Sequence, residues 1–269
     1  MQPADCPVGA PDTRLLSGTL CFVARDMAVR VHRHHCLQLL LALRGSFTSV
    51  VGATTYDHQQ SRLFASDVAH ACDATGCEAL VFFVEPTSAF GRALLPLLAQ
   101  GDGQTASLPG ALAERLRAIA TRSSEVPDVA VVIEVIGAIA HRNGGGMVST
   151  SAEGDARITA AIDWVEHHLG ESFDSAAVAR CVGLSGERFR HLFGQHTQMP
   201  VSEWGLWRRL RHVLARVLGD GFTLTDAALE AGFADQAHFC RVFARRFGIA
   251  ASGLLQNSRN VQFIVPVAR

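Results

Sequence analysis

The stretch TDAALEAGFADQAHFCRVFARRFG, residues 225–248, predicts two short helices joined by a tight turn. Gly232 supplies the turn, because a residue without Cβ adopts the left-handed conformation without steric cost. Asp235 stands where its carboxylate can cap the second helix. In that helix the apolar side chains recur at helical spacing and predict one buried stripe: Phe239, Val242, Phe243 and Phe247. The stretch therefore predicts a helix-turn-helix unit.

A similar unit lies about fifty residues earlier, in SAAVARCVGLSGERFRHLF, residues 175–193. Gly183 and Ser185 provide the turn and the cap of its second helix. The buried stripe of that helix is Phe189, Leu192 and Phe193. Two such units in one domain are a far more specific pattern than one.

The last hundred residues resemble the DNA-binding domain of the AraC/XylS transcription regulators. The matching residues run without gaps from about 157 to 250: Ile158, Ala161, Ile162, Ala179, Gly183, Leu184, Ser185, Phe189, Leu192, Phe193, Pro200, Trp204, Arg209, Leu210, Ala231, Gly232, Phe233, Asp235, Phe239, Arg241, Phe243, Phe247 and Gly248. The match weakens afterwards, where the family usually has a Ser-Pro and an Arg. The resemblance implies a regulator that binds double-stranded promoter DNA, often as a homodimer. Activation, with RNA polymerase as partner, is the commoner mode.

The same resemblance implies that the second helix of each unit enters the major groove. The residues expected to read bases are Glu187, Arg190 and His191 in the first unit, and Gln236, Ala237 and Arg241 in the second. The residues expected to bind phosphates are Arg188, Arg208, Arg245 and Arg246. The alternative for any one of them is an ordinary solvated surface charge.

Length and charge agree with a two-domain protein. The chain has 269 residues and an apolar fraction of 48%. No apolar run approaches the ~18 residues of a membrane span, and no secretion signal precedes the first domain, so we expect a cytoplasmic protein. Residues 155–269 hold 13 Arg against 11 acids, whereas residues 1–154 hold 11 Arg against 14 acids, so the small excess of positive charge is in the DNA-binding half. The seven cysteines are irregularly spaced, which favours free thiols.

The N-terminal half predicts a β domain followed by helices. Short apolar runs at 20–23, 37–43, 47–51 and 80–84 indicate strands of an antiparallel barrel or jelly roll. Helices are expected at 88–100, 109–122 and 127–142, where they either cover the barrel or pair with a second subunit. The predicted fold class is thus α+β, with a cupin-like β-barrel and flanking helices before an all-α domain. The expected boundaries are 1–142 for the sensor, 143–155 for a flexible linker, 156–256 for the DNA-binding domain and 257–269 for a tail.

The stretch VHRHHCLQLLLALRG, residues 31–45, concentrates candidate metal ligands. His32 and His34 alternate along an expected strand and so share a face, and Gln38 follows four residues later. The spacing is similar to the first cupin motif, in which Glu is usual at the position of Gln38. His70 stands where the second cupin motif has its histidine, although Ala65, Asp67 and Ala74 replace that motif's other residues.

The cupin resemblance implies one divalent transition metal, Zn²⁺, Ni²⁺, Fe²⁺ or Cu²⁺, held by His32, His34, Gln38 and His70. Cys36 and Cys72 are alternative ligands on the same face, while His35 should point outward. A small molecule in the same cavity is the competing expectation. Two further alternatives are a metal-dependent cupin enzyme, such as a dioxygenase, joined to a DNA-binding domain, and an empty barrel that serves only for dimerisation.

Overall fold

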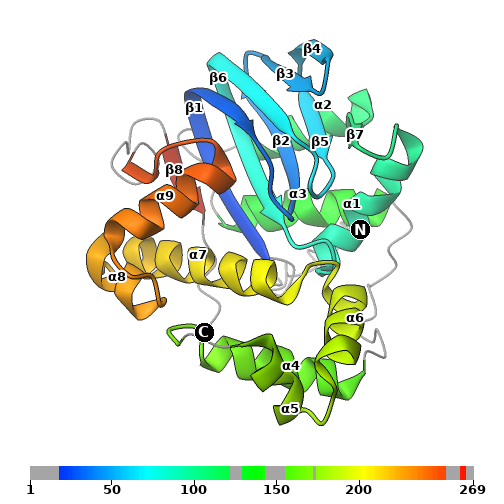
Figure 1. Ribbon diagram of the computed structural model, residues 1–269. Helices are drawn as coiled ribbons and strands as arrows, with labels where there is room; N and C mark the ends of the chain where they lie inside the picture. Colours follow the sequence, from blue (N-terminus) through cyan, green and yellow to red (C-terminus); the bar gives the residue numbers. More distant parts are fainter. Residues whose placement is uncertain (1–17, 122–128, 143–154, 172–173, 253–260, 265–269) are drawn as a thin grey trace, which may run out of the picture.

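The computed structural model describes residues 18–121, 129–142, 155–171, 174–252 and 261–264. Two lobes make up the molecule, a β lobe with its own helices and an all-helical lobe (Figure 1). The strands are β1 (Thr19–His32), β2 (Leu37–Arg44), β3 (Phe47–Val51), β4 (Thr54–Gln59), β5 (Ser61–Phe64), β6 (His70–Val84), β7 (Thr105–Ala106) and β8 (Val261–Ile264). All of them belong to one sheet.

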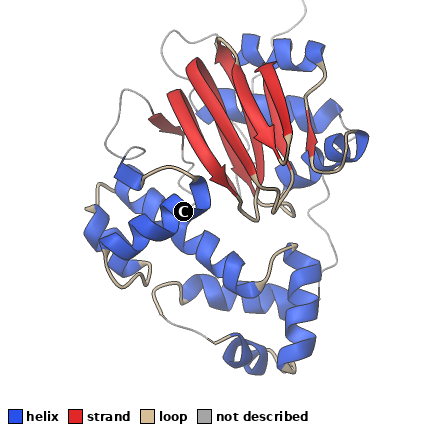
Figure 2. Cartoon of the chain, turned by 45° about the horizontal axis from the view of Figure 1, so that its top comes forward, coloured by secondary structure: helices blue, strands red, loops and turns tan. Residues whose placement is uncertain are grey.

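The sheet is antiparallel and is organised around β6. One edge of β6 pairs with β1 along its length, and its other edge pairs with β2 near one end and with β3 near the other. The path β4-β3-β6-β2-β5-β7 does not return on itself, so the sheet curls into a half-barrel. The predicted antiparallel β domain is confirmed, but its sheet is an open half-barrel and not the closed cupin-like barrel that was expected (Figure 2).

Helices α1 (Ala89–Gln100), α2 (Gly110–Ala120) and α3 (Val129–Arg142) cover the convex face of the half-barrel. Alternate residues of β2, such as Leu37, Leu39 and Leu41, face these helices in one apolar cluster. Their neighbours Gln38 and Leu40 face the concave side. Because both faces of the sheet are covered, β2 is a continuous apolar run rather than an alternating one. The helices therefore pack within the chain, the first of the two expected arrangements.

The helical lobe contains the two predicted units. Helices α5 (Ser175–Cys181) and α6 (Gly186–Thr197) form the first, and α8 (Leu224–Glu230) and α9 (Gln236–Phe247) form the second. Helix α4 (Ala156–His167) packs on the first unit. Helix α7 (Val201–Gly219) joins the units, and its 19 residues span roughly 28 Å at 1.5 Å per residue. That length is close to one turn of DNA, about 34 Å.

The predicted turns and caps are confirmed. Gly183 and Gly232 have φ of 68° and 78°, in the left-handed region. Ser185 Oγ accepts the backbone N–H of Arg188 at 3.3 Å, and Asp235 Oδ1 accepts that of His238 at 2.5 Å. These bonds satisfy backbone donors that a helix N-terminus otherwise leaves unpaired.

The C-terminal tail returns to the β lobe. Strand β8 pairs antiparallel with β1, with Cys21 opposite Ile264 and Ala24 opposite Val261. The helical lobe is therefore connected to the half-barrel from both of its ends. The expected linker lies outside the described residues, except for Asp155, which caps α4. No helix among the described ranges is long and apolar enough to cross a membrane.

Candidate functional site

Three histidines meet on the concave side of the half-barrel. His32 ends β1, His70 begins β6, and His34 lies in the connection between β1 and β2. Each is buried, and their candidate ligand atoms all lie within 4.8 Å of one another. The predicted grouping is present, but the expected strand alternation of His32 and His34 is wrong. The strand ends at His32, and the connection carries His34 to the same place.

Backbone carbonyls orient all three rings. Nδ1 of His32 lies 2.9 Å from the carbonyl oxygen of Arg30. Nδ1 of His34 and of His70 lie 3.0 Å and 2.8 Å from the carbonyls of Cys36 and Val68. A carbonyl oxygen can only accept, so Nδ1 donates in each case and the neutral ring presents a lone pair on Nε2. Metal-binding histidines are commonly oriented in this way.

The Gln38 amide occupies the centre of the group. Its Oε1 lies 2.8 Å from Nε2 of both His34 and His70. Two ring lone pairs are satisfied when the amide turns its NH₂ group to them, since that group carries two hydrogens. Nε2 of His32 is buried and has no hydrogen-bond partner of suitable distance and angle among the described residues, although the Gln38 side chain lies near enough to oppose the lowering of the ring's pKa. We call these four residues the histidine cluster.

Burial keeps the histidine cluster uncharged. Desolvation, assisted by the neighbouring His70 and His32, lowers the pKa of His34 to about 3. Desolvation also lowers the pKa of His70 to about 4, with His32 contributing, and it lowers the pKa of His32. A buried charge next to like charges is unfavourable, so all three rings are neutral near pH 7. Neutral imidazoles are the form that binds metal.

The cysteines expected as alternative ligands do not join the cluster. Cys36 and Cys72 are buried among apolar side chains, and the metal-compatible group among the described residues consists of histidines. Burial raises the pKa of the Cys72 thiol to about 12 and raises that of Cys36 as well. The reason is again the broken alternation, because Cys36 follows the bend and not the strand. The six described cysteines are free thiols.

The helical lobe closes the concave side over the histidine cluster. The ring of Phe247, the last residue of α9, lies 4.8 Å from that of Phe83 and 6.5 Å from that of His34, measured between centroids. Gly248 follows with φ of 69°. A Cβ on Gly248 would lie 2.7 Å from Cγ1 of Val29 and 2.9 Å from Nδ1 of His32. The end of α9 thus rests directly on the strand that carries His32.

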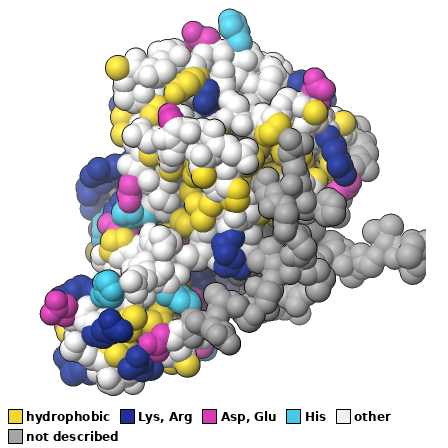
Figure 3. All heavy atoms as spheres, turned by 90° about the vertical axis from the view of Figure 1, so that its right-hand side faces the viewer, with side chains coloured by type: hydrophobic (Ala, Val, Ile, Leu, Met, Phe, Trp, Pro, Cys, Tyr) yellow, Lys and Arg dark blue, Asp and Glu magenta, His cyan; other side chains and the backbone are white. Residues whose placement is uncertain are grey.

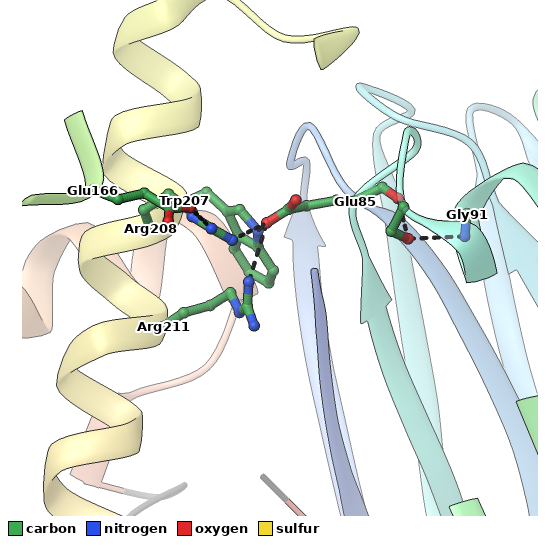
Figure 4. A network of polar contacts seen from close by, with 7 residues as sticks. Glu85, Gly91, Glu166, Trp207, Arg208 and Arg211 are labelled. Carbon is green, nitrogen blue, oxygen red and sulfur yellow. Dashed lines mark hydrogen bonds and ion pairs between the residues drawn. The ribbon is translucent and has the colours of Figure 1, made fainter. Parts of the chain in front are cut away.

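A second contact between the lobes centres on Glu85 (Figure 4). Its Oε1 accepts hydrogen bonds from Nε1 of Trp207 at 2.9 Å, from Arg208 at 2.9 Å and from Arg211 at 3.1 Å. Burial lowers the pKa of Arg211, and the Glu85 carboxylate opposes that shift. Arg208 also pairs with Glu166 of α4. One carboxylate of the β lobe therefore contacts two arginines of α7, and Glu166 supplies the second negative charge.

The Glu85 backbone is held in place by the start of α1. Ser88 Oγ donates to the Glu85 carbonyl at 2.8 Å and accepts the N–H of Gly91 at 3.0 Å. A Cβ on Gly91 would lie 2.1 Å from that carbonyl oxygen, so glycine is needed where α1 approaches the end of β6.

A third contact runs through His35. Its Nδ1 lies 2.5 Å from Oδ2 of Asp67, and its Nε2 lies 3.5 Å from Oε2 of Glu203 in α7. The same Glu203 oxygen is 2.5 Å from Arg246 of α9. His35 points away from the cluster, as predicted, but it faces the helical lobe and its side chain is 19% exposed.

Most residues predicted to contact DNA are on the surface. In the first unit the exposed ones are Glu187, Arg188, Arg190 and His191, and in the second they are Gln236, Ala237, Arg241 and Arg245. The lower lobe of the space-filling view (Figure 3), which corresponds to α4–α6, shows basic, acidic and histidine side chains beside one another. The surface positions leave these side chains accessible to a nucleic acid.

Two of the predicted phosphate contacts are placed differently. Arg208 is 20% exposed and pairs with Glu85 and Glu166, and Arg246 is 24% exposed and pairs with Glu203. Both guanidinium groups are thus engaged within the chain. The phosphate contact of Arg208 stays a prediction, and in this conformation the β lobe presents a carboxylate to its guanidinium group.

Sequence reasoning missed Glu85, Trp207, Arg211 and the docking role of Phe247. A signal was present in α7, where Trp204 and Trp207 lie three residues apart and both are buried. A helix that is apolar over more than one stripe packs against two partners. Trp204, Leu210 and Leu214 are buried, and Trp207, which is also buried, bonds to Glu85 at the interface between the lobes.

The helical lobe is similar in sequence to parts of known proteins. Residues 178–257 match a sequence family described as a helix-turn-helix domain. The arabinose operon regulatory protein of Salmonella typhimurium is 32% identical over 99 residues, 36% of this chain and 35% of that protein. The transcriptional activator RhaS of Escherichia fergusonii is 35% identical over 96 residues, 35% of this chain and 34% of that protein. The chain thus spans about a third of the length of these relatives.

The whole fold also has a counterpart. The structure of ToxT from Vibrio cholerae with a bound unsaturated fatty acid superposes with a TM-score of 0.53 at 10% identity, over 87% of this chain and 92% of that one. This likeness concerns the fold: a β lobe followed by a helical lobe with two helix-turn-helix units. The C-terminal part of the chain is therefore similar in sequence to the helix-turn-helix domains of these regulators, and the fold as a whole is similar to that of ToxT.

Proposed function

We propose that the protein is a cytoplasmic transcription regulator whose half-barrel binds an effector and whose two helix-turn-helix units bind promoter DNA. The observation that carries the proposal is the position of α9, a helix of the second unit, whose end covers the buried histidine cluster. An occupant of the cluster and the DNA-binding helix touch the same strand. One relative is described as an operon regulatory protein and RhaS as a transcriptional activator, which favours activation and a contact with RNA polymerase.

The first candidate effector is a divalent transition metal, Zn²⁺, Ni²⁺, Fe²⁺ or Cu²⁺. Three neutral imidazoles aim Nε2 lone pairs at one point, and the Gln38 amide could offer its oxygen as a fourth ligand. Metal–nitrogen bonds of about 2.0–2.1 Å would require the cluster to contract. The buried and otherwise unpaired Nε2 of His32 supports a missing occupant, since such atoms usually have a partner.

The second candidate is a small organic molecule in the cavity next to the cluster. That cavity is lined mainly by apolar residues of β1, β2 and β6 and reaches His32 and Gln38. ToxT binds an unsaturated fatty acid in its crystal structure, so a protein of this fold does accommodate an organic ligand. The cupin-enzyme alternative has less support, because the relatives are regulators rather than enzymes.

A homodimer remains part of the proposal. Helices α1–α3 already bury their inner faces against the sheet, so a dimer would use their outer sides, where Leu95 is 41% exposed. Sedimentation equilibrium of the full chain measures the assembly state directly. A single monomeric species at micromolar concentration, with and without DNA, would refute the proposed homodimer.

Selection from random double-stranded DNA tests the regulator itself. We expect the wild-type chain to enrich a sequence with two half-sites about one helical turn apart. Arg190→Ala and Arg241→Ala should each reduce the sequence preference at one half-site. Enrichment of no sequence would refute the DNA-binding role.

Metal content tests the first effector. Near-stoichiometric metal in the purified chain, lost in His32→Ala and in His70→Ala, is the expected result for a metal sensor. If neither purification nor incubation with Zn²⁺, Ni²⁺ or Cu²⁺ leaves metal bound, the metal candidate fails and the organic candidate stands.

A further inference from the structure

The cavity on the concave side is nearly filled by the protein itself. Its volume is about 30 Å³, although an organic ligand typically occupies a site of about 300–1,000 Å³. A single water needs about 10–15 Å³ of such volume. Any organic effector must therefore displace part of the wall before it can enter.

The walls of this cavity differ in how easily they can move. Most of the lining belongs to β1, β2 and β6, whose backbones are paired along their lengths. The remaining lining residues are Phe247 and Ile249, which come from the helical lobe. Outward movement of Phe247 and Ile249 breaks no strand pairing, so these two residues are the part of the lining that can be displaced.

The helix-turn-helix fold itself does not require these residues. Position by position, Thr197, Gln198 and Met199 end α6 as Phe247, Gly248 and Ile249 end α9. Gln198 caps α6 with φ of 56°, so a side chain is accepted in that conformation where the half-barrel is not in contact. At the end of α9 the larger Phe247 and the missing Cβ of Gly248 fit the half-barrel instead.

The lining also defines the chemistry of a ligand. Its side chains are uncharged, and among them His32 presents an unpaired Nε2 lone pair. A lone pair needs a donor, which a hydroxyl or N–H group supplies and an ether or ionised carboxylate does not. An uncharged apolar molecule with one O–H or N–H group satisfies the whole site.

We propose that the Phe247–Ile249 segment is a built-in competitor for the effector cavity, and that the effector is an uncharged apolar molecule that donates one hydrogen bond to Nε2 of His32. Entry of this molecule expels the end of α9 from the half-barrel and frees the second helix-turn-helix unit. The inference rests on the organic form of the proposed function. Since the two occupants exclude each other, anything that weakens docking of α9 strengthens binding of the molecule.

The test uses 2-naphthol, an apolar probe with one hydroxyl, and 2-methoxynaphthalene, which lacks the donor. Both are titrated calorimetrically into the full-length chain and into the double variant Phe247→Thr with Gly248→Gln, which copies the end of α6. We expect 2-naphthol to bind the double variant about tenfold more tightly than the wild type, because the competing docked state is removed. The matched control, Thr197→Ala with Gln198→Gly, alters the first unit and should bind like the wild type.

Two further measurements separate the parts of the proposal. Adding His32→Ala to the double variant should abolish the preference for 2-naphthol over 2-methoxynaphthalene. In the wild type, saturating 2-naphthol should speed amide hydrogen exchange in the last turn of α9 and not in that of α6.

Equal affinity of wild type and double variant for 2-naphthol would overturn the competition, and so would the absence of binding to both. A preference that survives His32→Ala would overturn the role of Nε2. None of these outcomes changes the result expected when the wild-type chain selects DNA sequences. Failure of the competition proposal is therefore distinguishable from failure of the proposed regulator function.

Discussion

The two helix-turn-helix units share a core and differ at one end. Phe189 and Phe239 occupy the same position of α6 and α9 and are both fully buried, as are Phe193 and Phe243 one turn later. At the last turn the units diverge, because α6 ends in a buried threonine whose hydroxyl bonds its own backbone, and α9 ends in Phe247. The first unit is complete by itself, and the second is completed by the half-barrel.

The divergence shows how one helical lobe can contain a helix-turn-helix unit that is free of the half-barrel and another that is docked on it. Contacts with the half-barrel come from α7 and α9, through Glu85, His35 and the Val29–His32 segment. Helix α4, which packs on the first unit, is linked to the β lobe through Arg208 of α7, which pairs with both Glu166 and Glu85. A change at the concave side is therefore felt most directly by the second unit.

The largest expected effect concerns the shared core. Phe189→Ala and Phe239→Ala each remove a fully buried aromatic ring, so each should lower the free energy of unfolding by about 3–5 kcal/mol. Chemical denaturation of the full-length variants measures both. Losses that differ by more than about 2 kcal/mol would show that the two cores are not equivalent.

The arginines predicted to contact bases give the next effect. Arg190→Ala and Arg241→Ala should each cost about 1–3 kcal/mol on the selected DNA and relax one base position. Arg208→Ala should leave this affinity nearly unchanged, because its guanidinium is engaged by Glu85 and Glu166. Binding isotherms at several salt concentrations measure the DNA affinity of each variant and its dependence on salt. A reduced salt slope for Arg208→Ala would return that residue to the phosphate contacts.

The two helix ends should respond differently to alanine. Gly248→Ala places a Cβ 2.7 Å from Val29 at positive φ, and we expect a loss of about 2 kcal/mol in the free energy of unfolding. Gln198→Ala changes an exposed residue in the same backbone conformation and should cost less than about 0.5 kcal/mol. Thermal unfolding of both variants is sufficient. Equal losses would mean that α9 is not docked in solution.

The caps give the smallest effect. Ser185→Ala and Asp235→Ala should each cost about 1 kcal/mol, since each removes one acceptor at a helix N-terminus. The shorter and charged bond of Asp235 should make its loss the larger of the two. Urea titrations of the variants compare them, and a larger loss at Ser185 would reverse this order.

Much of the fold was predictable because its signals are local. The turns at Gly183 and Gly232, the caps at Ser185 and Asp235, and the phenylalanine stripes each depend on residues within one helical turn or two. The helices over the half-barrel were predicted within a few residues for the same reason. The strands were found by their apolar runs, although β1 and β6 extend well beyond the short runs that indicated them.

The residues of the histidine cluster were predictable from the sequence, but the backbone path that brings them together was not. His32, His34, Gln38 and His70 were identified from spacing, and they do meet. Their route to one place was misjudged, because a bend after His32 is not visible in an alternating pattern. The same bend removed Cys36 from the cluster and turned His35 toward Glu203.

By itself, the amino-acid sequence determined two helix-turn-helix units, a β domain before them and a histidine group within it, because each depends on short-range spacing and side-chain chemistry. Tertiary structure alone decided that Glu85 pairs with Arg208 and Arg211, that Phe247 closes the half-barrel and that the C-terminal strand joins its sheet. Those contacts join residues more than a hundred positions apart. Their formation depends on how two finished domains fit together, and no local pattern encodes that fit.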